Sequence, residues 1–108
     1  VALRHLGAKP TQWSPVGLRI DLDADARSPG VHAEPEFIKG AVEVQDEGSQ
    51  LAALFSAAKS GEQVIDLCAG AGGKTLALSM LMHGTGRIYA MDVSQKRLRE
   101  LAPRPRRA

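Results

Sequence analysis

Residues 64–75 read VIDLCAGAGGKT, and this stretch decides the fold of the chain. An apolar run ends at Asp66, gives way to a glycine-rich loop, and is followed from Lys74 by a second apolar stretch. Glycine tolerates positive φ and has no Cβ, so such a loop lets a ligand approach the backbone closely. The helix that follows offers free N–H groups and the positive end of its dipole. The stretch therefore predicts a strand, a loop and a helix that bind a nucleotide-like ligand.

Three kinds of loop compete for this sequence. GKT at 73–75 matches the tail of a phosphate-binding P-loop, but Cys68 stands where that loop needs its first glycine. Gly70 and Gly72 begin a dinucleotide fingerprint whose third glycine is missing. The third candidate is the S-adenosylmethionine loop, in which an acid at a strand end precedes Gly-x-Gly, and Asp66 supplies that acid.

A second landmark favours the S-adenosylmethionine loop. Residues 86–92 read GRIYAMD and predict a buried strand that ends at Asp92. The apolar segment 74–83 is long enough for a crossover helix, so strands at 63–67 and 87–91 would pair in parallel in an α/β fold. An acid at the tip of the second strand can accept hydrogen bonds from ribose hydroxyls. A P-loop protein has no particular need of that acid.

Length and composition set the outer bounds. With 108 residues, the chain is one small domain or a piece of a larger one, and its 44% hydrophobic content is typical of globular proteins. There is neither an apolar run of membrane-spanning length nor the pattern of a secretory leader. The single cysteine excludes an internal disulfide, is typical of a reducing cytoplasm, and leaves no zinc-site spacing. Because the chain starts at Val1 and stops after its second strand–helix unit, we expect it to be an excerpt.

The pattern before the glycine loop predicts several short elements. A helix end stopped at Gly7 and two strands, at 11–13 and 17–21, are expected first, with Trp13 in the core. The acidic, turn-rich segment 21–30 reads as a linker or long loop.

The entry to the glycine loop is expected to be a helical turn, a strand and a longer helix. The turn covers 35–39 and the strand 41–45. The helix starts with Asp46 as its N-cap and ends at Gly61. One apolar face of this helix is predicted, and it consists of Leu51, Leu54, Phe55 and Ala58.

After the second strand, one more helix is expected. Ser94 would cap it and Pro103 would break it. The basic residues Arg104, Arg106 and Arg107 are read as a solvated face or frayed end.

Two motifs together resemble the Sun-type RNA cytosine-C5 methyltransferases, and most closely the bacterial members that modify small-subunit ribosomal RNA. They are VQDEGSQ at 44–50 and DLCAGAGGKT at 66–75, followed by the acid after the second strand. The family usually has Ala-Pro where this chain has Gly70-Ala71, a change toward the generic methyltransferase Gly-x-Gly. The resemblance implies the first βαβ unit of a Rossmann-like class I methyltransferase sheet, preceded by a small α+β segment. Residues 1–33 would end an RNA-binding-type module, and 34–108 would form the N-terminal half of the S-adenosylmethionine-binding domain.

The resemblance also implies site roles. In the family, one cysteine thiolate attacks cytosine and a second assists product release. Their Asp-Ala-Pro-Cys and Thr-Cys-Ser motifs do not occur in these 108 residues, so no catalytic residue is assigned and the chain alone is expected to be inactive. Cys68 is read as a small buried residue at the strand end. The implied cofactor-binding residues are Cys68, Ala69, Gly70, Ala71, Gly72, Gly73, Lys74, Asp92, Val93 and Arg97.

The remaining expectations concern partners and alternatives. The resemblance implies S-adenosylmethionine as cofactor, ribosomal RNA as partner, and no membrane. An unpaired edge of the first strand is expected to promote self-association of this chain. The alternatives are a non-catalytic relative that binds RNA or another partner and, on GKT at 73–75, a P-loop nucleotide-binding protein.

Overall fold

The structure, a computed structural model, describes residues 3–21 and 30–107, so most of the expected linker at 21–30 lies outside the described residues. The elements, in chain order and with η denoting a 3-10 helix, are η1 (Arg4–Leu6), β1 (Lys9–Pro10), β2 (Leu18–Arg19), η2 (Val31–Ala33), α1 (Pro35–Ile38), α2 (Glu47–Phe55), β3 (Gln63–Asp66), α3 (Gly73–Leu81), β4 (Arg87–Ala90), α4 (Gln95–Leu101) and α5 (Pro103–Arg107). No described helix is long and apolar enough to cross a lipid bilayer.

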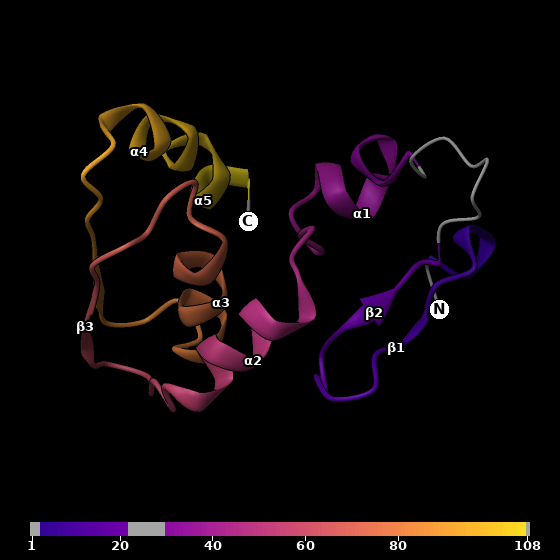
Figure 1. Cartoon of the computed structure of the whole chain (residues 1–108), viewed down its shortest axis with the longest axis horizontal. Helices are drawn as coiled ribbons and strands as arrows, with labels where there is room; N and C mark the ends of the chain where they lie inside the picture. Colours follow the sequence, from indigo (N-terminus) through magenta and orange to yellow (C-terminus); the bar gives the residue numbers. More distant parts are fainter. Residues whose placement is uncertain (1–2, 22–29, 108) are drawn as a thin grey trace.

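The predicted parallel strand pair is present. β3 and β4 pair in parallel, in a register that runs from Gln63 opposite Arg87 to Asp66 opposite Ala90. α3 makes the connection and lies beside the two strands, while α2 packs against α3 (Figure 1). This arrangement confirms the βαβ unit. α3 ends at Leu81 instead of running to residue 83, because the backbone of His83 has already turned to φ 52°.

The small core lies between α2, α3 and one face of the strand pair. Ala53, Leu78 and Met82 are almost completely buried there. On the opposite face, Ile65 is 60% exposed and its register partner Tyr89 is also exposed. Within the described residues, therefore, the sheet is covered on only one side, whereas parallel sheets are normally covered on both.

The segment before α2 corrects two predictions. Residues 41–45 belong to neither sheet of the described chain, so the expected strand does not form. The helix begins where predicted, after Asp46, but ends at Phe55. The Ser56 hydroxyl donates to the Ala53 carbonyl at 2.6 Å, and Ala57 then turns to φ 52°, so the chain leaves the helix before Gly61. Phe55 is consequently 83% exposed and not part of a packed face.

The N-terminal unit is a small antiparallel hairpin. β1 pairs with β2 through Lys9–Arg19 and Pro10–Leu18, so the second strand lies within the range 17–21 predicted for it, whereas the first lies before the predicted range 11–13. Gly7 ends η1 with φ 72°, as predicted for a helix stop. Trp13 lies between the two strands and is 67% exposed, so its assignment to the core is wrong.

Candidate functional site

The glycine loop joins the carboxyl end of β3 to the start of α3. Gly70 and Gly72 adopt φ 54° and φ 90°, values that L side chains rarely take. The Gly72 N–H donates to the Ala69 carbonyl at 2.8 Å, which closes a tight turn. The Ala69 N–H donates to the Met91 carbonyl at 2.9 Å, so the start of the loop stays attached to the end of the second strand.

Asp92 connects the loop to the second strand. One carboxylate oxygen accepts the Gly70 N–H at 2.9 Å, and the other accepts the Ser94 N–H at 2.7 Å. These two hydrogen bonds, from Ser94 and then Gly70, hold the pKa of the Asp92 carboxyl below its ordinary value, with a further contribution from the positive charge of Arg97. The group is therefore an anion at neutral pH, and each oxygen still has accepting capacity beyond the bond it makes.

Asp66 fixes the other side of the loop. Its carboxylate accepts the Thr75 hydroxyl at 2.8 Å, and Thr75 is buried in the first turn of α3. The Asp66 carboxylate thus ties the end of β3 to the start of α3 through a side chain.

The predicted cofactor residues gather at one edge of the strand pair. Ala69 and Gly72 are buried at the base of the loop. Cys68 is exposed, which corrects its interpretation as a buried residue; its thiol is a free thiol. Lys74, Val93 and Arg97 are exposed as well, so charged and apolar side chains project beside the loop.

The last two helices pack against the glycine loop. An added Cβ on Gly72 would lie 2.6 Å from Cγ and 2.8 Å from Cδ1 of Leu101, the last residue of α4. Such distances are far inside ordinary contact, so the absence of a side chain at residue 72 lets α4 approach. Ser94 caps α4 as predicted, accepting the Arg97 N–H.

The C-terminal arginines correct another expectation. Arg104 and Arg107 are about one-fifth exposed, and both form ion pairs with Glu43. Only Arg106 of the three has the solvent exposure that the sequence suggested for all of them.

The motif at 44–50 surrounds the start of α2. The Asp46 carboxylate accepts the Ser49 N–H at 3.0 Å, an N-cap as predicted. Gln50 donates to the Gln45 carbonyl at 3.2 Å and accepts the Ser14 hydroxyl at 2.7 Å. The Gln45 side-chain nitrogen is buried and has no hydrogen-bond partner in the described chain, and it lies 3.4 Å from the position of an added Cβ on Gly73. The Gln45 side-chain amide is therefore a hydrogen-bond donor without a partner in the described chain, and it lies close to the start of α3.

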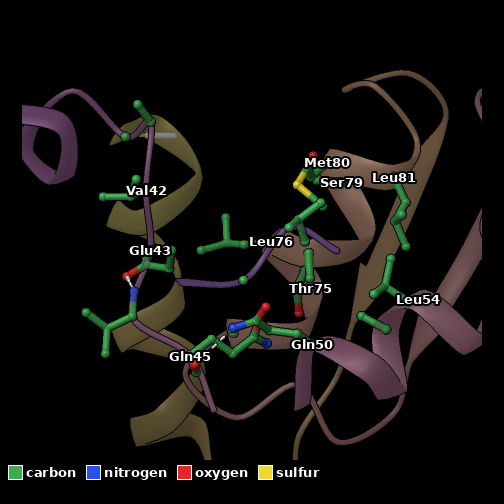
Figure 2. Close-up of a pocket in the computed structure, with 18 of the residues that line it drawn as sticks. Val42, Glu43, Gln45, Gln50, Leu54, Thr75, Leu76, Ser79, Met80 and Leu81 are labelled. Carbon is green, nitrogen blue, oxygen red and sulfur yellow. Dashed lines mark hydrogen bonds between the residues drawn. The ribbon is translucent and has the colours of Figure 1, made fainter. Parts of the chain in front are cut away.

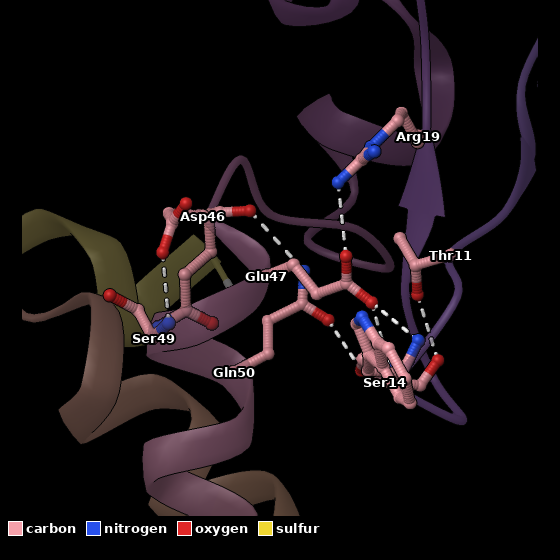
Figure 3. Close-up of polar contacts among 9 residues, drawn as sticks. Thr11, Ser14, Arg19, Asp46, Glu47, Ser49 and Gln50 are labelled. Atoms are coloured by element: carbon pink, nitrogen blue, oxygen red, sulfur yellow. Dashed lines mark hydrogen bonds and ion pairs between the residues drawn. The ribbon is translucent and has the colours of Figure 1, made fainter.

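Glu47 is the important residue that the sequence did not reveal. One carboxylate oxygen accepts the N–H groups of Trp13 and Ser14, at 2.7 and 3.0 Å, while the other pairs with Arg19 at 3.0 Å (Figure 3). The side chain is only 11% exposed. The backbone hydrogen bonds, that from Ser14 first, hold the pKa of the Glu47 carboxyl below its ordinary value. A first-turn glutamate thus fastens the N-terminal hairpin to α2.

A separate cavity of about 1090 Å³ lies between α2, α3 and the segment before α2. Val42, Leu54, Leu76 and Met80 line it, as Figure 2 shows. Neither Asp92 nor residues 68–72 belong to its lining. Residues 68–72 and Asp92 therefore lie outside this cavity, whereas Gly73 and Thr75 at the start of α3 line it together with polar side chains such as Gln45 and Gln50. Across the described residues, no three His, Cys, Asp or Glu side chains come together as a metal site.

The described geometry defines an α/β chain of the methyltransferase type, and solved structures agree. The chain superimposes on PH0851 with a TM-score of 0.83 at 32% identity, covering 98% of this chain and 23% of that one. A methyltransferase homolog protein from Pyrococcus horikoshii gives a TM-score of 0.67 at 37% identity, covering 75% and 27%. NSun6 from Pyrococcus horikoshii, solved with SFG, gives 0.68 at 31% identity, covering 74% and 21%.

Sequence comparison identifies the family. The family model described as 16S rRNA methyltransferase RsmB/F matches residues 53–107, half of the chain. The chain belongs to this family. Ribosomal RNA small subunit methyltransferase B of Salmonella paratyphi B (strain ATCC BAA-1250 / SPB7) and that of Salmonella newport (strain SL254) are each 41% identical to it over 68 residues. That alignment covers 63% of this chain and 16% of the relative, so the chain spans a small part of the curated relatives.

Proposed function

We propose that this chain supplies the first part of the S-adenosylmethionine site of an RNA cytosine-C5 methyltransferase that acts on ribosomal RNA in the cytoplasm. The observation that carries the proposal is the Asp92 carboxylate beside Gly70, at the edge where both parallel strands end. An ionised acid next to a glycine turn suits a ligand that has ribose hydroxyls. S-adenosylmethionine is such a ligand, and it is the donor of an electrophilic methyl group.

The residues present fit that ligand. Gly70 has φ 54°, and an added Cβ there would meet only Asp92 Oδ2 at 4.0 Å, so a ligand can approach the backbone at this residue. Asp92 would accept the ribose hydroxyls, and Val93 and Arg97 would border the adenine. Residues 68–74 would surround the methionine part, with Lys74 near its carboxylate.

The proposed chemistry needs more than these residues. Cytosine methylation at C5 requires a thiolate that attacks the ring, and the cysteine motifs that carry it in the family are not among the 108 residues. Cys68 belongs to the glycine loop and is not assigned to this step. The role proposed for the chain is therefore to bind and orient the cofactor.

The proposal also concerns the RNA side. Residues 1–33 are proposed to belong to the end of an RNA-binding-type module. Support comes from Trp13, whose ring is exposed while its backbone is held by Glu47. An exposed aromatic ring on an anchored backbone offers a face on which a base can stack.

Calorimetric titration with S-adenosylmethionine tests the cofactor site. We expect measurable binding by the unaltered chain and about tenfold weaker binding by Asp92→Ala, because ribose hydroxyls would lose a charged acceptor. Asp21→Ala is the matched control, since it removes an exposed carboxylate that pairs with Lys9 in the N-terminal hairpin region. Equal affinity of Asp92→Ala and the unaltered chain, or no binding by the unaltered chain, would refute the proposed role.

A further inference from the structure

The C-terminal helix α5 holds the glycine loop from outside. The Arg104 guanidinium donates from Nη1 to the Ala71 carbonyl at 2.5 Å. Its Nε and Nη2 both lie 3.4 Å from one carboxylate oxygen of Glu43, in the segment before α2. One planar side chain, 21% exposed, thus connects the loop to a segment distant in sequence.

Glu43 is itself held in place by a second arginine. Arg107 pairs with the same carboxylate oxygen, donates to the Phe37 carbonyl at 2.7 Å, and lies over the Phe37 ring at 3.8 Å from its centroid. The two arginines therefore share one anchor, Glu43. Only Arg104 touches the loop.

The contact fixes one particular peptide plane. The carbonyl of Ala71 and the N–H of Gly72 belong to the same planar unit. Arg104 holds the carbonyl, and the Ala69 carbonyl accepts the N–H at 2.8 Å. Gly72 could otherwise adopt either sign of φ, so the peptide could turn over without a steric penalty from a side chain. With both ends bonded, the loop keeps φ 90° at Gly72.

We propose that Arg104 is a positioning residue for the glycine loop: it holds the 71–72 peptide in the orientation in which the loop backbone meets the cofactor. Glu43 orients the guanidinium, and Arg107 keeps Glu43 in place. The consequence for S-adenosylmethionine affinity rests on the proposed function, whereas the effect on the loop itself does not. No cofactor chemistry is assigned to Arg104, whose guanidinium is engaged by the Ala71 carbonyl and the Glu43 carboxylate.

The test compares Arg104→Ala with Arg107→Ala in the full chain. Each variant removes one guanidinium from Glu43, but only the first removes a contact with the loop. Amide hydrogen exchange of Gly72 is measured relative to that of Met91, whose N–H is bonded to the Asp66 carbonyl at the strand end. General destabilisation accelerates exchange at both amides, and loosening of the loop accelerates Gly72 alone.

We expect the Gly72-to-Met91 exchange ratio to rise about tenfold in Arg104→Ala and by a smaller factor in Arg107→Ala, in which Glu43 loses an arginine partner but Arg104 still donates to the Ala71 carbonyl. Arg104→Lys, which keeps one donor and the charge, should give an intermediate ratio. S-adenosylmethionine affinity should follow the same order across the variants. Equal ratios in the two alanine variants, or an unchanged ratio in Arg104→Ala, would overturn the positioning role.

The two proposals fail in different ways. If the exchange ratio rises selectively but the unaltered chain binds no S-adenosylmethionine, the positioning role is supported and the proposed function is refuted. If the unaltered chain binds the cofactor while Arg104→Ala changes neither the ratio nor the affinity, the positioning role is refuted and the proposed function stands.

Discussion

Replacing Gly72 by alanine should destabilise the chain more than the same change at any glycine that faces open space. The backbone at Gly72 has φ 90°, and a left-handed conformation costs a non-glycine residue about 1–2 kcal/mol. The added methyl group would also lie 2.6 Å from Cγ of Leu101. Forcing an extra methyl group into such a contact typically costs about 1–3 kcal/mol. The expected total is about 2–5 kcal/mol of unfolding free energy.

The chain provides a matched control for the backbone part of this cost. Gly61 has φ 83°, and an added Cβ there meets nothing within 4 Å. Gly61→Ala should therefore cost only the about 1–2 kcal/mol of the left-handed conformation. Both variants are measured by urea unfolding, with the free energy taken from the linear dependence on denaturant.

A double-substitution cycle isolates the contact with α4. Leu101→Ala removes the atoms that the new methyl group would meet, so the double variant should recover about 1–3 kcal/mol relative to additivity. If Gly72→Ala costs no more than Gly61→Ala, or if Gly72→Ala and Leu101→Ala are additive, close packing of α4 on the loop is not the reason for glycine at residue 72.

Three further outcomes are expected. Hydrogen bonds from the Ser14 and Trp13 N–H groups hold the pKa of Glu47 below its ordinary value of 4.5, so its stabilising contribution is present above that value and is lost as the pH falls through the lowered pKa. Glu47→Gln should therefore lose less stability than the unaltered chain as the pH falls below 4.5, in acid titration followed by circular dichroism. Trp13→Ala should leave the unfolding free energy within about 0.5 kcal/mol but weaken binding of single-stranded RNA in a fluorescence anisotropy titration, and unchanged RNA binding would contradict the stacking proposal. Among the described residues β3 pairs only with β4, and Ile65 is exposed on the uncovered face. The chain should therefore self-associate in sedimentation experiments, and Ile65→Lys should shift it toward monomer. A strictly monomeric unaltered chain that unfolds above about 65 °C would refute this expectation.

The sequence predicted the elements whose signals are local. The first strand is an apolar run with an acid at its end, and the loop after it is rich in glycine, so both could be recognised within a few residues. The same holds for the caps, because Asp46 and Ser94 bond N–H groups three residues further along the chain. Such contacts depend on the order of neighbouring residues and on little else.

The contacts that organise the site across the chain could not be predicted in the same way. Glu47 reads as an ordinary first-turn acid, yet it also binds the hairpin through Trp13 and Ser14. Arg104 reads as part of a solvated basic end, yet it reaches Ala71 in the glycine loop. Neither contact can be predicted from sequence spacing, because a glutamate or arginine that is solvated and one that is paired are the same residue in the sequence.

The prediction that two large side chains are buried was wrong for a different reason. Phe55 and Trp13 were expected to pack because of their size and apolar character. Whether such a side chain is buried depends on which surfaces face it after folding. Phe55 falls at the last residue of a helix that ends early, and Trp13 falls at a hairpin bend, so neither faces the core formed around Met82.

The glycine loop is held by contacts on several sides, whereas the sheet that it follows is covered, among the described residues, on one face only. Asp66 and Asp92 hold it through Thr75 and Gly70, and α4 and α5 close it from outside, all with residues between 66 and 104. The sheet, in contrast, leaves one face uncovered in the described chain. Because a ligand loses affinity when it must order the groups that bind it, a loop already fixed by its own surroundings retains its binding geometry even where the sheet is small. The contacts of Leu101 and Arg104 with the loop do not pass through the sheet, so they hold the loop even where β3 and β4 are short.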